Sequence, residues 1–207
     1  MFISKSLQDR VRVSISIAWK LLQSKIQGGL IDINKEASLQ LHFANILQNV
    51  LSLITYSEDE FVSISLEKTL NNGTKNCEAD VFISCNKNTT KYTFAIEMKC
   101  YRQVAGSGKK RGGQEVFHRE VYTDLYNLEN YISNKQCDEG IFLAMTDYDN
   151  IVKPKAKRGT FWKDVDISNN IKITSGKTFT YSGSSFSLKK SYIFKWKKVG
   201  DFYYLKL

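Results

Sequence analysis

The chain has one proline in 207 residues, no low-complexity tract and no internal repeat. It also lacks a run of the roughly 18 to 20 apolar residues that a membrane-spanning helix needs. The N-terminus has no apolar segment followed by a small-residue cleavage site. We therefore expect a single soluble domain in the cytoplasm, without a membrane partner.

Cysteine and histidine are scarce and scattered. The residues are Cys77, Cys85, Cys100, Cys137, His42 and His118. No two cysteines form a C-x-x-C pair, and both histidines lie far from the cysteines in sequence. This spacing argues against a structural zinc site and favours four reduced thiols.

Basic residues exceed acidic ones, 30 against 21, giving a net charge of +9. Such an excess favours a polyanionic partner, most simply DNA, although a basic protein can also be merely soluble. Two basic clusters in expected loops, "GSGKKRGG" (106–113) and "KPKAKRGTFWK" (153–163), sharpen the prediction. The residues expected to contact phosphates are Lys109, Lys110, Arg111, Lys155, Lys157 and Arg158.

The hydrophobic pattern predicts an α/β (α+β) domain with a mixed central sheet flanked by helices. The expected elements are helices at 7–27, 34–54 and 114–133 and strands at 60–70, 78–84, 92–101 and 140–146. Further strands rich in aromatic residues follow towards the C-terminus. Within one domain, we expect an N-terminal helical segment (1–33), a core (34–146), and a basic loop with a β-rich C-terminal extension (147–207).

The stretch "DVFISCNKNTTKYTFAIEMKCY" (80–101) predicts a β-hairpin. Its second strand places Glu97 and Lys99 on the same face, because side chains two apart in a strand point the same way. Counting from a turn near Asn88 puts Asp80 opposite Ile96, one step from Glu97. We therefore expect Asp80, Glu97 and Lys99 to lie close together.

Two carboxylates and a lysine at neighbouring strand ends suit a hard divalent cation. Oxygen ligands from Asp80 and Glu97 favour Mg²⁺, with Mn²⁺ as a substitute. Lys99 could orient or help deprotonate a water, or stabilise charge on a phosphate oxygen. A metal ion and a lysine at an acidic site are typical of enzymes that hydrolyse phosphodiester bonds.

Asp80, a gap of 16 residues and then Glu97-Met98-Lys99 resembles the D…(D/E)-x-K signature of the PD-(D/E)XK nuclease superfamily. The resemblance covers roughly residues 34–146. It departs from the full motif at Ala79, where proline is usual. It implies a restriction-endonuclease-like core and a Mg²⁺-dependent DNA endonuclease, acting on double-stranded DNA. It further implies that the Met98 carbonyl joins the metal ligands and that Glu36 completes the catalytic set.

Several alternatives stay open. The chain could be a non-catalytic nucleic-acid-binding or accessory protein that retains the nuclease fold. Glu36 could be an ordinary acid favoured by the helix dipole. Asp124, inside an apolar stripe, could support the site or be a buried acid bonded to a backbone amide or a tyrosine.

Assembly is a separate expectation. A chain with one site cuts one strand, so a double-strand break is simplest for a homodimer. The aromatic C-terminal segment could supply the dimer surface or cover the sheet within one chain. Its aromatic residues are Tyr192, Phe194, Trp196, Phe202, Tyr203 and Tyr204.

Overall fold

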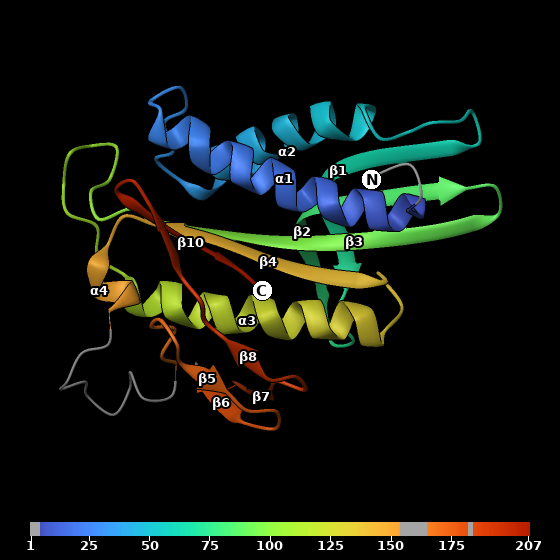
Figure 1. Ribbon diagram of the computed structural model, residues 1–207. Helices are drawn as coiled ribbons and strands as arrows, with labels where there is room; N and C mark the ends of the chain where they lie inside the picture. The colour runs from blue at the N-terminus through green and yellow to red at the C-terminus, as the bar shows by residue number, and fades with distance from the viewer. Residues whose placement is uncertain (1–4, 154–164, 182–183) are drawn as a thin grey trace.

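The computed structural model describes residues 5–153, 165–181 and 184–207 and is built around a six-stranded mixed sheet (Figure 1). The strand order is β1-β2-β3-β4-β10-β9, and only the pairing of β3 with β4 is parallel. The strands are β1 (Glu60–Asn71), β2 (Asn76–Lys87), β3 (Thr90–Tyr101), β4 (Glu139–Thr146), β9 (Lys197–Val199) and β10 (Phe202–Lys206).

Helices cover both faces of this sheet (Figure 1). The helices are α1 (Leu7–Gln27), α2 (Glu36–Ser52), α3 (Gln114–Ser133) and the short α4 (Asp149–Val152). Helices α1 and α2 pack on one face and α3 on the other, so that each face has its own hydrophobic core. The predicted mixed α/β arrangement is confirmed; the restriction-endonuclease-like character of its core stays a prediction.

The long helices form where the apolar period predicts them. The stripe of α1 is fully buried from Val11 to Leu22, and Gly28 follows its last turn. The Ser6 hydroxyl accepts a hydrogen bond from the Asp9 amide, which satisfies one of the free N–H groups at the helix start. Helix α3 has the predicted bounds, whereas α4 was not predicted.

The C-terminal residues are divided between the central sheet and a layer beneath α3 (Figure 1). Strand β10 extends the central sheet antiparallel to β4, and β9 pairs antiparallel with β10. Two small sheets pair β5 (Lys172–Ile173) with β8 (Tyr192–Ile193) and β6 (Thr178–Tyr181) with β7 (Ser184–Ser187). The ring of Tyr122 on α3 lies 4.4 Å from that of Phe179, which joins this layer to the second core.

The aromatic C-terminal side chains pack within the chain. Phe194, Trp196, Tyr203 and Tyr204 are all buried. Trp196 also donates a hydrogen bond of 2.7 Å from its indole nitrogen to the Ile167 carbonyl. These four side chains therefore cover the chain's own core, whereas Tyr192 and Phe202 are half-buried, and the predicted dimer stays a prediction.

Among the described residues, every helix is either too short or too polar to cross a lipid bilayer.

Candidate active site

Strands β2 and β3 diverge at the residues that the sequence singled out. Their pairing ends at Val81 opposite Ile96, a register that places Asp80 level with Glu97. Beyond this point β3 continues along β4, while β2 pairs only with β1. Val81 still belongs to the core under α1 and α2, but Ala79 belongs to the core over α3. The two acidic side chains therefore lie where the hairpin opens.

Asp80 is held in place by backbone contacts at this opening. Its Oδ2 accepts a hydrogen bond of 2.6 Å from the Met98 amide, and its carbonyl oxygen accepts one of 2.5 Å from Gln40 Nε2. The carboxylate thus accepts a hydrogen bond from a backbone N–H of β3 at the point where the hydrogen-bonded pairing of β2 with β3 ends. This bond ties Asp80 to the Glu97-Met98-Lys99 segment.

Glu97 and Lys99 point towards α3, as predicted from their shared face. Glu97 is only 4% exposed, and its Oε1 accepts a hydrogen bond of 3.3 Å from the Tyr131 hydroxyl. Lys99 Nζ lies 2.9 Å from Glu36 Oε1 and 3.2 Å from Asp124 Oδ2. The structure thus brings together all four side chains expected to be catalytic, and adds Asp124.

The cluster has more negative than positive charge. Burial raises the pKa of Asp80 to about 6, against the opposing effects of the Met98 amide and Lys99. Burial likewise raises the pKa of Asp124 to about 8, and that of Glu97 well above its usual range with the help of Asp124 and Asp80. A single lysine does not balance these acids, so the cluster favours bound protons or a cation.

Lys99 itself stays charged. Burial would lower the pKa of its ammonium group, but the carboxylates of Asp124 and Glu36 outweigh this effect and raise it. A permanently protonated lysine donates hydrogen bonds and cannot accept a proton. The arrangement therefore favours a role in stabilising negative charge over a role as a base.

The side chains expected to bind a metal fit a cation in part. Asp80 and Glu97 each have one oxygen in a hydrogen bond that fixes the carboxylate, and the second oxygen of each makes no hydrogen bond to the described residues. Within residues 5–153, 165–181 and 184–207, no group of three or more His, Cys, Asp or Glu side chains is arranged to hold a metal ion. The predicted ligand set of two carboxylates and the Met98 carbonyl therefore stays a prediction.

Sequence reasoning left the role of Asp124 open and did not predict the contacts of two other side chains. Asp124 forms an ion pair with Lys99, and it makes no hydrogen bond to a backbone amide or a tyrosine of the described residues. Tyr131, seven residues further along α3 and thus on the same helix face, was not predicted to contact Glu97. Gln40, one turn after Glu36 on α2, was also missed.

The first basic cluster lies in the ordered loop that follows β3. Tyr101 donates a hydrogen bond of 2.8 Å to the Arg111 carbonyl, and an isolated bridge joins Val104 to Lys110. Lys109 and Lys110 are exposed, and the described residues include no ion-pair partner for them. Of the second cluster, Lys155, Lys157 and Arg158 lie outside the described residues.

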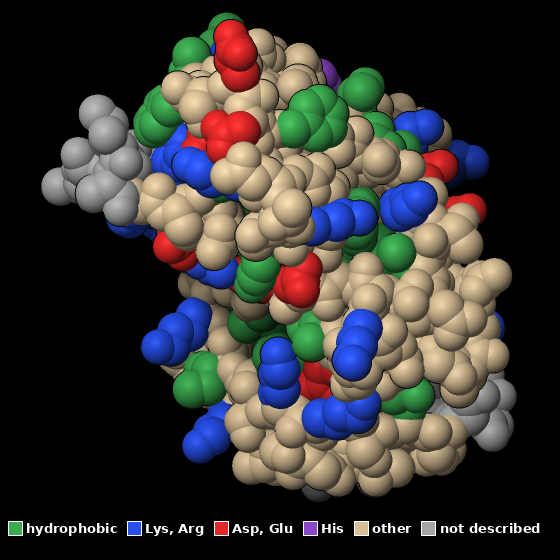
Figure 2. Space-filling view, turned by 90° about the vertical axis from the view of Figure 1, so that its right-hand side faces the viewer, with side chains coloured by type: hydrophobic (Ala, Val, Ile, Leu, Met, Phe, Trp, Pro, Cys, Tyr) green, Lys and Arg blue, Asp and Glu red, His purple; other side chains and the backbone are tan. Residues whose placement is uncertain are grey.

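Positive charge is not confined to these loops. Figure 2, viewed from the right-hand side of Figure 1, shows Lys and Arg side chains spread over that face with fewer acidic ones between them. Electrostatic attraction to a polyanion therefore does not depend on one loop alone.

The buried acids predict how stability depends on pH. A carboxyl group whose pKa is raised on folding binds its proton more tightly in the native state, so its stabilising effect is lost as pH rises. For Asp80 and Asp124 this loss runs from about pH 4 to about pH 8. We expect the urea midpoint to fall over this range, and to fall less in Asp124→Asn. An equal fall of the urea midpoint in the wild type and in Asp124→Asn would contradict a contribution of this acidic cluster to the pH dependence.

No family model matches the chain, and neither the curated proteins nor the solved structures include a significant match.

Proposed function

We propose that the protein is a Mg²⁺-dependent DNA endonuclease of the restriction-endonuclease type. The observation that carries this proposal is the opening of the β2–β3 hairpin at Asp80 and Glu97, with Lys99 held beside them by Glu36 and Asp124. The net charge of +9 supports a polyanionic substrate.

The residues of the site have different roles in the proposed reaction. The free oxygens of Asp80 and Glu97, with the Met98 carbonyl, would hold the cation. When bound, Mg²⁺ supplies charge compensation at the phosphate and lowers the pKa of a water. Lys99 donates to a non-bridging phosphate oxygen, where charge grows as water attacks phosphorus and the 3′ oxygen leaves. Glu36 and Asp124 position the lysine and keep it protonated.

The direct test is nicking of a supercoiled plasmid. We expect purified protein to convert it to open-circular or linear DNA with Mg²⁺ or Mn²⁺ and to leave it intact with EDTA. DNA binding without cleavage under any metal condition would instead favour the alternative, a non-catalytic nucleic-acid-binding or accessory protein.

The basic loop predicts a salt effect. Replacing both Lys109 and Lys110 with glutamine should reduce the slope of log affinity against log salt by about 0.9 for each phosphate that is no longer neutralised. Fluorescence anisotropy with a short duplex measures this slope. The matched control is Lys75→Gln/Lys91→Gln, which removes the same charge from exposed positions elsewhere. An equal change in both variants would show that the loop has no specific role.

Double-strand cleavage predicts assembly on DNA. Since one chain has one candidate site, we expect two copies about a two-fold axis on the duplex. Light scattering of the protein with and without DNA should give the mass of a dimer in the complex. A monomeric complex that makes double-strand breaks in one encounter would exclude this arrangement.

A further inference from the structure

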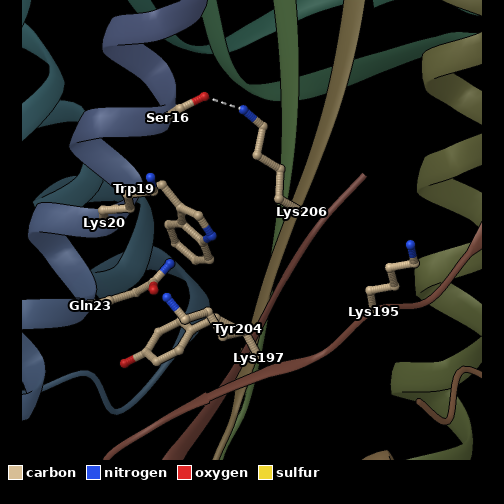
Figure 3. A pocket seen from close by; sticks show the side chains of 8 residues that line it. All are labelled: Ser16, Trp19, Lys20, Gln23, Lys195, Lys197, Tyr204 and Lys206. Atoms are coloured by element: carbon tan, nitrogen blue, oxygen red, sulfur yellow. Dashed lines mark hydrogen bonds between the residues drawn. The ribbon is translucent and has the colours of Figure 1, made fainter. Parts of the chain in front are cut away.

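A concavity separate from the candidate active site lies between α1 and the β9–β10 edge of the sheet. It is on the opposite face of the sheet from Glu97 and Lys99. Its volume is about 340 Å³, within the range of small-ligand sites. The described lining residues, drawn in Figure 3, include four lysines and no acidic side chain; they are Ser16, Trp19, Lys20, Gln23, Lys195, Lys197, Tyr204 and Lys206.

Local structure explains how these side chains converge. On α1, Ser16, Trp19, Lys20 and Gln23 are spaced three or four residues apart and share one helix face. On the sheet, Tyr204 and Lys206 are two apart in β10, and Lys197 of β9 is directly opposite Tyr204. These three side chains therefore share the sheet face that packs under α1.

Figure 3 shows Lys206 reaching across to α1, and Lys206 Nζ donates a hydrogen bond of 2.6 Å to Ser16 Oγ. In the same view Lys195 lies apart from the other labelled side chains. Trp19 and Tyr204 meet edge to face at 5.6 Å and form a rigid apolar wall.

The positive charge of this pocket is not neutralised within the described chain. None of the four lysines forms an ion pair there with a carboxylate within 4 Å. Burial lowers the pKa of Lys206 and Lys20 lowers it further, whereas Glu139 opposes the shift. Like charges gathered around one concavity repel each other unless an anion lies between them.

Gln23 supplies an independent indication of a ligand. It is only 6% exposed and its side chain makes no hydrogen bond to the described residues, but its amide atoms are open to the concavity and are not sealed in the core. Figure 3 shows this amide pointing into the concavity. Edge-strand protection explains lysines on β9 and β10, but it accounts for neither Lys20 nor an amide on α1 that faces the concavity without a hydrogen bond to the described residues.

We propose that this pocket, which we call the lysine pocket, binds a small ligand with two or more adjacent phosphate groups. Lys20, Lys197 and Lys206 surround the anion as point charges, and the Gln23 amide donates a hydrogen bond to it. A compact oligophosphate suits a single concavity, whereas an extended nucleic-acid backbone would need charges along a line. The proposal is independent of DNA cleavage at Glu97.

Isothermal titration with inorganic tripolyphosphate at constant ionic strength tests the proposal. We expect saturable binding to the wild type, weakened about ten-fold or more in Lys197→Gln/Lys206→Gln. The control Lys75→Gln/Lys91→Gln removes the same charge from exposed positions elsewhere and should change the affinity less than about two-fold. Absence of binding to the wild type, or equal weakening in both variants, would overturn the proposal.

Two further measurements separate a built site from a charged surface. Gln23→Met keeps most of the side-chain volume but removes the amide, so it should weaken tripolyphosphate binding without lowering the thermal midpoint. A short DNA duplex should compete poorly with tripolyphosphate for the lysine pocket. Unchanged affinity in Gln23→Met, or a duplex that displaces tripolyphosphate efficiently, would contradict a small-ligand site.

Discussion

Replacing Glu97 with glutamine should reduce DNA cleavage by about 10³-fold, because the change removes one of the two proposed carboxylate ligands and, with it, several kcal/mol of metal-dependent stabilisation. Asp80→Asn should have a similar effect. Both substitutions preserve side-chain volume, and the amide can keep the hydrogen bond to Tyr131 or Met98. Cleavage rates and isothermal titration with Mn²⁺ measure the loss of activity and of metal affinity together.

A matched control separates ligand loss from damage to a buried acid. Glu129 on α3 is 3% exposed and accepts hydrogen bonds from the backbone of Lys189 and Lys190 and from the Tyr192 hydroxyl. Glu129→Gln should therefore lower stability but leave cleavage and Mn²⁺ affinity close to wild type. Unchanged Mn²⁺ affinity in both Asp80→Asn and Glu97→Gln would remove the ligand assignment.

Replacing Lys99 with methionine should abolish cleavage and also lower the free energy of unfolding by about 3 kcal/mol, because it leaves Glu36 and Asp124 without their cation. Protonation of the acids would offset part of this loss at low pH. Urea unfolding at neutral and acidic pH measures both effects.

The double variant Lys99→Met/Asp124→Asn distinguishes a catalytic lysine from a structural one. Removing both partners should recover part of the stability, since Asp124 is then no longer a buried acid without its cation. Cleavage should nevertheless stay at background, because the donor to the phosphate is absent. A stable double variant that cuts DNA would show that Lys99 acts only as an ion-pair partner.

The candidate site was predictable where it depends on local geometry. The alternation of "FAIEMKC" places Glu97 and Lys99 on one face, and counting across the turn places Asp80 within one residue of its observed level. The long helices follow from their apolar stripes in the same way. Each of these inferences uses only spacing within a single element or hairpin.

Contacts made by distant segments were not predictable in this way. Tyr131 meets Glu97, and Asp124 meets Lys99, only because α3 packs across β3. Lys206 meets Ser16 from 190 residues away, because β10 joins the sheet beside β4 under α1. The hydrophobic period of a segment does not specify which other segment it packs against. The lysine pocket therefore could not be predicted from the sequence.

The central claim is that the site at the β2–β3 opening cuts DNA. The most direct measurement compares wild type and Glu97→Gln, purified in parallel, on one supercoiled plasmid with Mg²⁺, and then tests whether DNA ligase reseals the nicks. We predict nicking by the wild type only, with 5′-phosphate and 3′-hydroxyl ends that ligase joins. Equal nicking by both proteins, or none by either, would contradict the claim.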